Sequence, residues 1–298
     1  MNTKKIDTML INVADMALKR RARYIVENID VQNSDVILDA GCGDGYYLHL
    51  LHSYNKNALF IGSDFDERAL QSAERNFKSN HIKVSWLKPN AGSKVDVKTL
   101  KKGVVYLCQA DLMKSLPFKN NVFTKIVLGE VAEHLPSDTK GLKELHRVMK
   151  KNATIVITVP NQNYSFLWDP INWVLERTAK THVKDGFFAG LWYDHIRLYR
   201  PNEIEKVTKK AGFKVEKIIA HTYWALPFNH HIINLGARLL YGGKLSESVV
   251  KSVSKYKKST KKPLLIQLFF FIVNTVDSLN NFYTPKDMGA GVFVKAKK

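Results

Sequence analysis

Val36-Ile37-Leu38-Asp39-Ala40-Gly41-Cys42-Gly43-Asp44-Gly45 is the stretch that decides the fold of this chain. A short apolar run rich in β-branched residues ends in an acid and then breaks into alternating glycines. This pattern predicts a buried strand followed by a tight turn whose backbone approaches a ligand closely. Residues 46–54 then resume an apolar pattern of helical type. A strand, a glycine turn and a helix in this order predict a small-molecule site at the carboxyl edge of a parallel sheet.

The spacing of the glycines and the acids beside them limit which ligands this turn can bind. A dinucleotide site requires G-x-G-x-x-G, whereas this turn reads G-x-G-x-G with Tyr46 in place of the third glycine. Asp39 and Asp44 flank the turn, and two carboxylates would repel a diphosphate. A second apolar run ends in Asp64, where a carboxylate can accept both hydroxyls of a ribose. S-adenosylmethionine fits these demands, because it carries a sulfonium and an ammonium group and no phosphate.

These segments resemble the class I S-adenosylmethionine-dependent methyltransferases, nearest in motif to the ubiquinone- and menaquinone-type small-molecule enzymes. Further matching segments follow in order at 110–112, 116–135, 142–160 and 195–219, so the resemblance covers roughly residues 30–160 and 195–220. One departure is Lys125, where the family usually has an aspartate. The resemblance implies that S-adenosyl-L-methionine is the cofactor. It implies that the cofactor is bound by Asp39 (ammonium), Gly41 and Gly43 (methionine portion), Asp64 (ribose), Phe65 (adenine face), and Asp111 and Leu112 (adenine edge).

Base candidates follow the predicted strand at 124–129. Glu130, Glu133 and His134 are spaced i, i+3 and i+4, so one turn of helix would present all three side chains at the mouth of that strand. The same E-x-x-E-H array occurs in the ubiquinone O-methyltransferase branch, where the resemblance implies a divalent metal near the acceptor. Oxygen-rich chelation suits that spacing. A capping or packing role for His134 stays open, and we commit to no metal ligand.

His195 is the other base candidate, at the point where a predicted lid rejoins the core. A neutral imidazole there could take a phenol or hydroxyl proton. It could equally bond to backbone and anchor the lid. We take His134, His195 and Glu130 as the catalytic candidates.

The alternation of strands and helices predicts a doubly wound, Rossmann-like α/β fold. We expect a seven-stranded sheet with an antiparallel last strand and a helical cap. Helices are expected at 5–28, 45–53, 66–79, 139–150 and 201–211. Strands are expected at 35–39, 59–64, 83–86, 104–109, 124–129, 154–159, 214–220 and 289–298, and the polar segment 88–103 is expected to be a loop with at most a short helix.

Two additions to the core are expected to build the acceptor side. We divide the chain into an N-terminal helix (1–30), a core (31–220) that includes a lid (161–200), an apolar helical insertion (221–288) and the final strand (289–298). Because loops that leave parallel strands emerge at the ligand edge, the lid and the insertion should meet above the methyl group. Both are rich in aromatic residues, and an apolar helix is expected at 232–241. The substrate entrance should therefore be apolar.

Composition sets further bounds. The chain has 298 residues, 45% of them hydrophobic, which is enough for a substantial core. Its two cysteines exclude a disulfide framework and a cysteine-rich zinc site. No N-terminal signal is apparent, so we expect a cytoplasmic protein. The formal net charge of +19 implies attraction to polyanions or to an anionic membrane surface, with dense clusters at 19–23 and 255–262.

The second basic cluster precedes the most apolar run of the chain, residues 263–273, which is too short to span a bilayer. A helix over 263–282 could lie in a membrane interface or pack as a buried cap. The leading expectation is methyl transfer to an oxygen or carbon of an apolar small molecule, such as a quinone precursor, a lipid or a lipid-linked sugar. The alternatives are a tRNA-modifying methyltransferase and an inactive partner subunit. Nucleic acid is disfavoured because no RNA-binding module accompanies the charge, and the sequence does not indicate an oligomeric state.

Overall fold

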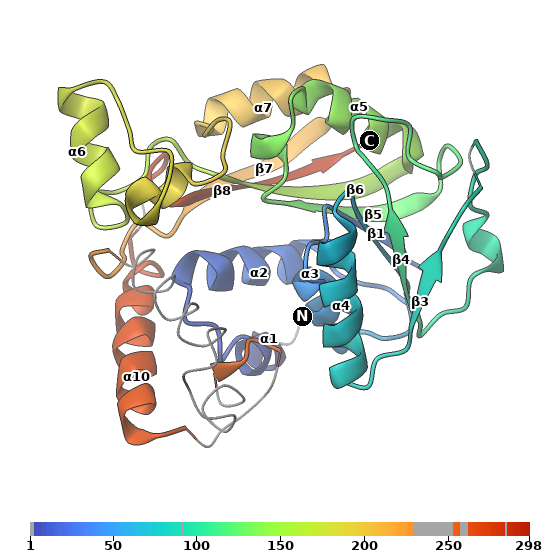
Figure 1. The fold of residues 1–298 in the computed structure, drawn as a ribbon, viewed down its shortest axis with the longest axis horizontal. Coiled ribbons are helices and arrows are strands. Elements are labelled where there is room, and N and C mark those ends of the chain that lie inside the picture. The colour runs from blue at the N-terminus through green and yellow to red at the C-terminus, as the bar shows by residue number, and fades with distance from the viewer. Residues whose placement is uncertain (1–2, 91, 229–252, 257–261, 284) are drawn as a thin grey trace.

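The computed structural model describes residues 3–90, 92–228, 253–256, 262–283 and 285–298. Its framework is one mixed β-sheet with helices on both faces (Figure 1). Along the sheet the strand order is β3-β4-β2-β1-β5-β6-β8-β7. The strands are β1 (Val36–Ala40), β2 (Leu59–Asp64), β3 (Val84–Leu87), β4 (Val105–Gln109), β5 (Phe123–Gly129), β6 (Met149–Pro160), β7 (Lys214–His221) and β8 (Gly291–Lys297).

The strand order confirms the predicted α/β fold. β1 pairs in parallel with β2 on one side and with β5 on the other, so the winding of the chain reverses at β1. In open α/β sheets this reversal marks the crevice where ligands bind. The last strand, β8, lies between β6 and β7 and is antiparallel to both, as expected. The described sheet has eight strands rather than seven, because β3 joins its outer edge in parallel with β4.

The helices form two layers around the sheet (Figure 1). Apolar side chains of α1 to α4 pack on one face, and those of α5 and α7 pack on the other. The polar segment before β4 contains only a short 3-10 helix, as expected. The α-helices are α1 (Thr3–Met9), α2 (Met16–Ile29), α3 (Tyr46–Tyr54), α4 (Glu67–Ser79), α5 (Asp138–Val148), α6 (Pro170–Thr178), α7 (Pro201–Lys210) and α10 (Leu264–Leu279), and the 3-10 helices are η1 (Val97–Thr99), η2 (Ala132–His134) and η3 (Phe187–Trp192).

The single helix predicted for residues 5–28 is wrong, because two helices occupy this segment. α1 ends at Met9, and α2 begins only at Met16. Asp15 sets the second start, since its carboxylate accepts hydrogen bonds from the backbone amides of Ala17 and Leu18, at 2.9 and 3.1 Å. The break lets both short helices turn apolar side chains toward the sheet.

The insertion between β7 and β8 is described in part. The apolar helix expected at 232–241 and the lysines at 257, 258 and 261 lie outside the described residues. α10 falls within the expected range of 263–282. It shares one hydrophobic cluster with α2 and the 161–200 segment, which includes Met16, Trp168, Leu191 and Val273. No helix in the described part of the chain is long and apolar enough to cross a membrane.

Candidate functional site

The glycine turn after β1 is shaped for close approach. Gly41, Gly43 and Gly45 have φ of 75°, 52° and 82°, the left-handed region that L side chains rarely adopt. A Cβ on Gly41 would lie 2.4 Å from Cγ2 of Val131, so the turn presses directly against the segment that follows β5. At Gly43 no described atom lies within 4 Å of such a Cβ. The turn is therefore packed on one side and open on the other.

Asp39, at the carboxyl end of β1, is an acid without a partner. Its side chain is fully buried, and neither carboxylate oxygen accepts a hydrogen bond of normal geometry from any described residue. Burial, followed by the proximity of Asp64 and Asp44, raises the pKa of Asp39 to about 8. A buried carboxyl group in this state calls for a cationic ligand. Beside an open glycine turn, it fits the ammonium group of S-adenosylmethionine.

The remaining cofactor candidates lie at the ends of the neighbouring strands. Asp64 ends β2, where its two carboxylate oxygens accept hydrogen bonds from the backbone amides of Gly43 (2.9 Å) and Asp66 (3.0 Å). The next residue, Phe65, is 75% exposed. Beyond β4, the amide of Ala110 bonds to the carbonyl of Asp64 at 2.9 Å, which brings the following residues to the same edge.

Asp111 and Leu112 belong to that edge segment. The carboxylate of Asp111 accepts a hydrogen bond from the backbone amide of Met113 at 2.8 Å, which fixes the loop. Leu112 is buried. All seven residues predicted to bind the cofactor therefore lie along the carboxyl ends of β1, β2 and β4.

A second group of side chains gathers after β5. Glu133 is fully buried, and its Oε1 lies 3.9 Å from Nε2 of His134 and 3.9 Å from Nε2 of His195. The Nδ1 atom of His134 lies 2.9 Å from the carbonyl oxygen of Asp194, and that of His195 contacts the carbonyl of Leu191. Because a carbonyl can only accept, each Nδ1 carries a hydrogen, and the Nε2 atom of each ring is the one that lies near Glu133.

Burial affects the protonation of Glu133 and His195, two members of the trio formed by Glu133, His134 and His195. Burial and the nearby charge of Glu130 raise the pKa of Glu133 well above its usual value. Burial lowers the pKa of His195 below its usual value. The carboxyl group therefore favours its protonated form, while His195 favours its neutral form. An arrangement of one acid beside two imidazole lone pairs can accept and pass on a proton.

The same trio could hold a divalent metal. One ligand atom from each of the three side chains lies within 4.8 Å of the others. Two imidazoles and one carboxylate form a donor set that zinc accepts, and metal-bound histidines usually donate their other ring N–H to a backbone carbonyl or carboxylate, as both do here. The donor chemistry of the trio fits such an ion.

Glu130 departs from its predicted place. The structure puts it ahead of the short 3-10 helix η2, with φ of 57°, so the expected single turn of α-helix does not form. Its Oε2 lies 2.7 Å from Nη1 of Arg21 on α2. Glu133, which the sequence analysis did not select as catalytic, lies between the two histidines instead. Glu133 is the second acid of the E-x-x-E-H motif. The sequence does not distinguish it from Glu130, and only its complete burial in the structure does.

His195 owes its position to hydrogen bonds between two distant segments. The amide of Ile196 donates to the carbonyl of Glu133 at 3.2 Å, and the guanidinium of Arg197 donates to the carbonyl of Leu135 at 2.7 Å. The hydroxyl of Tyr199 donates to the carboxylate of Asp138 at 2.8 Å. The lid therefore rejoins the core along residues 133–138, which brings His195 against Glu133.

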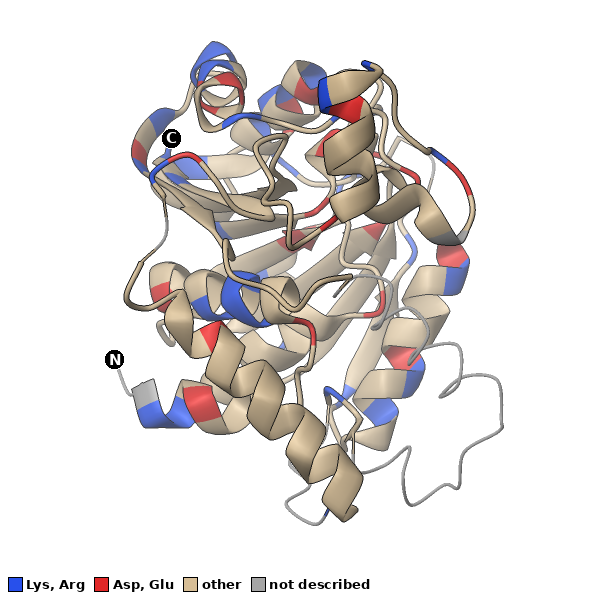
Figure 2. Cartoon of the chain, turned by 90° about the vertical axis from the view of Figure 1, so that its left-hand side faces the viewer, with Lys and Arg blue, Asp and Glu red and all other residues tan. Residues whose placement is uncertain are grey.

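The basic cluster at 19–23 lies among acidic and polar partners (Figure 2). Lys19 donates to Asn274 at 2.6 Å, and Arg20 donates to Asp277 at 2.6 Å, both on α10. Arg21 pairs with Glu130, as described above. Burial lowers the pKa of Arg21, but Glu130, Tyr47 and Asp15 together raise it above its usual value. Sequence reasoning treated these residues as surface charge and missed Arg21 as part of the site.

Apolar side chains lie exposed on the lid. Tyr193 and Ile196 flank His195 in the chain, and both are more than half exposed. Phe166 and Phe188, also on the lid, are about half exposed. Two of these exposed apolar side chains, those of Tyr193 and Ile196, therefore lie within two residues of His195 in the chain.

Comparisons with known proteins identify the family of the chain. A family model described as "Methyltransferase domain" matches residues 15–218. The ubiquinone biosynthesis O-methyltransferase of Pseudomonas syringae pv. tomato is 23% identical over 68% of this chain and 74% of its own length. The demethylmenaquinone methyltransferase of Staphylococcus saprophyticus is 25% identical, over 47% of this chain and 51% of its own.

Solved structures show the same fold. The YcgJ protein of Bacillus subtilis superposes with a TM-score of 0.53 at 12% identity, covering 94% of this chain and 98% of that one. The [4+2]-cyclase SpnF superposes with a TM-score of 0.52 at 15% identity, covering 94% of this chain and 80% of that one. At these identities the likeness concerns the architecture alone.

Proposed function

Because the chain belongs to the class I S-adenosylmethionine-dependent methyltransferase family, we propose that it methylates an oxygen or carbon of an apolar small molecule. The acceptor class is that of quinone precursors, lipids or lipid-linked sugars. The observation that carries this proposal is the trio of Glu133, His134 and His195, in which the acid is fully buried, close to exposed apolar lid residues. The names of the quinone-pathway relatives point in the same direction.

On the cofactor side, the role of this chain's residues is to bind S-adenosylmethionine and to orient it. S-adenosylmethionine, when bound, supplies an electrophilic methyl group whose leaving group needs no protonation. The backbone of Gly41 and Gly43 would hold its methionine portion, and ionised Asp39 would pair with its ammonium group. Asp64 would bind the ribose hydroxyls, and Phe65, Asp111 and Leu112 would hold the adenine. Catalysis then depends mainly on alignment of the methyl group with the acceptor.

On the acceptor side, we assign the general base to His195. Its side chain is 16% exposed against 40% for His134, and the lowered pKa of His195 keeps the imidazole neutral and able to accept a proton. Nε2 of His195 takes the proton of an acceptor hydroxyl, and the positive charge of the imidazolium that forms favours ionisation of the Glu133 carboxyl group beside it. Where a divalent ion is bound, Glu133, His134 and His195 would hold it, and it would lower the pKa of that hydroxyl.

The test is a measurement of S-adenosylhomocysteine formation with three acceptors: a catechol that bears a short isoprenoid chain, the same catechol without the chain, and bulk tRNA. The proposal expects the highest kcat/KM for the prenylated catechol and loss of turnover in the His195→Asn variant. Methylation of tRNA with no activity on either catechol would overturn it. Tight cofactor binding with no turnover on any acceptor would instead support the inactive-subunit alternative.

A further inference from the structure

α10 presents a largely apolar face to solvent, in which Thr275 is an exposed polar residue. Leu264 and Leu265 are each 80% exposed, and Phe271 is 68% exposed. Figure 2, in which α10 faces the viewer, shows the helix without charged residues along most of its length. The other large apolar side chains exposed on this helix and directly after it are Leu268, Ile272, Leu279, Phe282 and Tyr283. Eight large apolar groups on one surface are unusual for a monomeric protein.

The opposite face of α10 is fixed to the body of the protein. Phe270 and Val273 are buried, and Val273 belongs to the cluster shared with α2 and the lid. Asp277, the only acid of α10, is buried and forms an ion pair with Arg20 at 2.6 Å. These contacts fix the rotation of α10 about its axis. Because its inner face is held against α2, its apolar face points to solvent.

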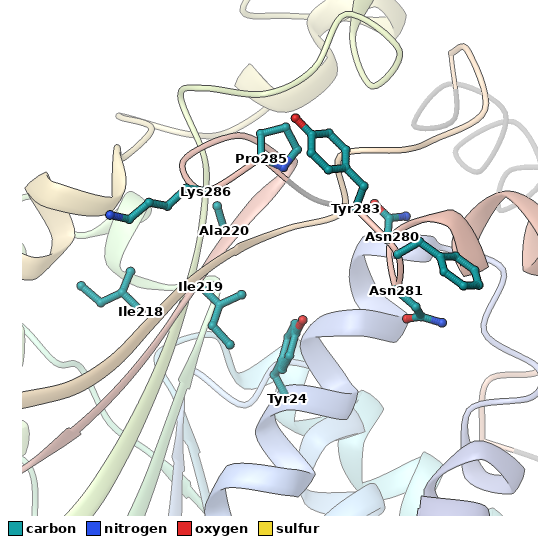
Figure 3. A pocket seen from close by; sticks show the side chains of 10 residues that line it. Tyr24, Ile218, Ile219, Ala220, Asn280, Asn281, Tyr283, Pro285 and Lys286 are labelled. Carbon is teal, nitrogen blue, oxygen red and sulfur yellow. The ribbon is translucent and has the colours of Figure 1, made fainter.

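Positive charge flanks the apolar face at both ends. Lys262 lies just before α10, with its ammonium 4.5 Å from the centre of the Phe270 ring. The segment 255–262 contains five lysines in eight residues. Beyond the other end, Lys286 lines a pocket of about 260 Å³ together with Phe282, Tyr283 and Tyr24 (Figure 3). α10 itself therefore exposes no acid. At each end of the helix a described lysine lies near an aromatic residue: Lys262 near Phe270, and Lys286 near Phe282 and Tyr283.

We propose that α10 docks this enzyme on the surface of an anionic lipid bilayer. A helix of 16 residues is too short to span the hydrocarbon layer, but its apolar face can lie in the headgroup region with the flanking lysines near lipid phosphates. Anionic lipid is the occupant that complements the positive charge of these lysines. The formal net charge of +19 adds to the attraction between the protein and such a lipid surface. A second copy of this chain would bring like charges together at the same face.

The inference does not depend on which acceptor the enzyme methylates. It is tested by co-sedimentation of the full chain with phosphatidylcholine vesicles, with and without phosphatidylglycerol, in the absence of cofactor and acceptor. The apolar variant is Leu265→Gln/Leu268→Gln/Phe271→Gln, in which all three side chains are already exposed. The matched control, Ile11→Gln/Val174→Gln, removes exposed apolar groups elsewhere. A charge variant, Lys262→Glu/Lys286→Glu, tests the flanks.

The proposal expects binding to the anionic vesicles only, a loss of at least about tenfold in the apolar variant, and unchanged binding in the control. The charge variant should bind several-fold more weakly, and added salt should weaken the wild type, because exposed charges are screened. Absence of vesicle binding by the wild type would overturn the proposal, as would binding that survives the apolar substitutions. A dimer that the apolar variant converts to a monomer, without vesicle binding, would assign the face to a second copy instead.

Discussion

The carboxyl ends of β1 and β5 each bury an acid, and the surroundings of the two acids are opposite. Asp39 and Glu133 are both fully buried, and neither carboxylate accepts a hydrogen bond of normal geometry from the described residues. Burial raises the pKa of both. The charges nearest Asp39 are other acids, Asp64 and Asp44, whereas Glu133 faces the Nε2 atoms of two imidazoles.

This difference in surroundings suggests that the two acids have different roles: Asp39 binds the cofactor, and Glu133 takes part in the chemistry on the acceptor. Asp39 has no positively charged side chain beside it among the described residues, so a cation that arrives from outside, such as the ammonium group of the cofactor, would stabilise its ionised form. An acid that faces two imidazole lone pairs can exchange a proton with them, or share a metal with them. The first acid should therefore govern cofactor affinity, and the second should govern turnover.

The largest expected effect is on turnover. We expect Glu133→Gln and His195→Asn each to lower kcat by roughly 10² to 10⁴-fold, the range for loss of general acid–base catalysis. The dissociation constant for S-adenosylmethionine should change by less than about threefold, since neither side chain belongs to the cofactor edge. Steady-state kinetics with the best acceptor and calorimetric titration of the cofactor measure the two quantities separately.

The control for these variants is His52→Gln, a histidine of α3 whose ring makes an edge-on contact with that of Phe60. It should leave kcat unchanged within about twofold. If the trio holds a metal, exhaustive dialysis against a chelator will abolish turnover, and added zinc or magnesium will restore it. A Glu133→Gln enzyme with normal kcat and weakened cofactor binding would reverse the division of roles.

The second effect concerns affinity. Asp39→Asn keeps the shape of the side chain but removes its charge, so we expect the S-adenosylmethionine dissociation constant to rise by roughly 100-fold, which corresponds to about 2.7 kcal/mol. Near neutral pH the unliganded variant should melt at or above the wild-type temperature, because an amide does not have to take up a proton on folding as this carboxyl group does. Asp44→Asn is the matched control: Asp44 is partly exposed and pairs with Lys255 at 2.8 Å, so its loss should change the affinity less than about threefold. Equal effects from the two variants would contradict the assignment.

The same contrast explains which half of the site could be read from the sequence. The cofactor edge is built from residues that directly follow β1, β2 and β4, so the local order of strand, acid and glycine was enough to predict it. The acceptor side combines Arg21, Glu133 and His195 from three distant segments. No local pattern shows that residues 195–199 bond to residues 132–138, or that burial selects Glu133 over Glu130.

The role of the basic cluster at 19–23 and the start of α2 also could not be predicted from the local sequence alone. The cluster at 19–23 is basic in sequence, but its function depends on Asp277 and Glu130, which lie more than 100 residues away. The break before α2 comes from the Asp15 cap, which competes with a continuous apolar stripe that favours one long helix. The strand expected at 83–86 does form, as β3, and it is the strand that brings the sheet to eight instead of the seven of the family pattern.

A smaller effect should come from Gly43, on the open side of the cofactor turn. In Gly43→Ala the new methyl group has room in the unliganded protein, so only the left-handed backbone resists it, at about 1 kcal/mol. The same methyl group would occupy space that the cofactor needs, and we expect affinity to fall roughly 30-fold, or about 2 kcal/mol. Gly41→Ala should instead destabilise the fold, because its Cβ would overlap Val131. Melting temperatures with and without cofactor distinguish the two cases.

The smallest effect, and the most specific to Asp39, is on the pH dependence of cofactor affinity. With a pKa of about 8, Asp39 is mostly protonated near neutral pH in the unliganded protein, and pairing with an ammonium group requires the ionised form. Affinity should therefore rise by up to about tenfold between about pH 6 and pH 7, with release of close to one proton per cofactor bound.

The stability of the unliganded protein should change in the opposite direction. A carboxyl group whose pKa is higher in the folded than in the unfolded state makes folding less favourable as pH rises from its ordinary value of 3.8 to about 8. The increase in melting temperature caused by S-adenosylmethionine should therefore be larger at about pH 7 than at about pH 6. Calorimetry in buffers of different ionisation enthalpy counts the released proton, and Asp44→Asn should behave as the wild type does. A pH-independent affinity would mean that Asp39 is already ionised before the cofactor binds, and the contrast with Glu133 would then rest on geometry alone.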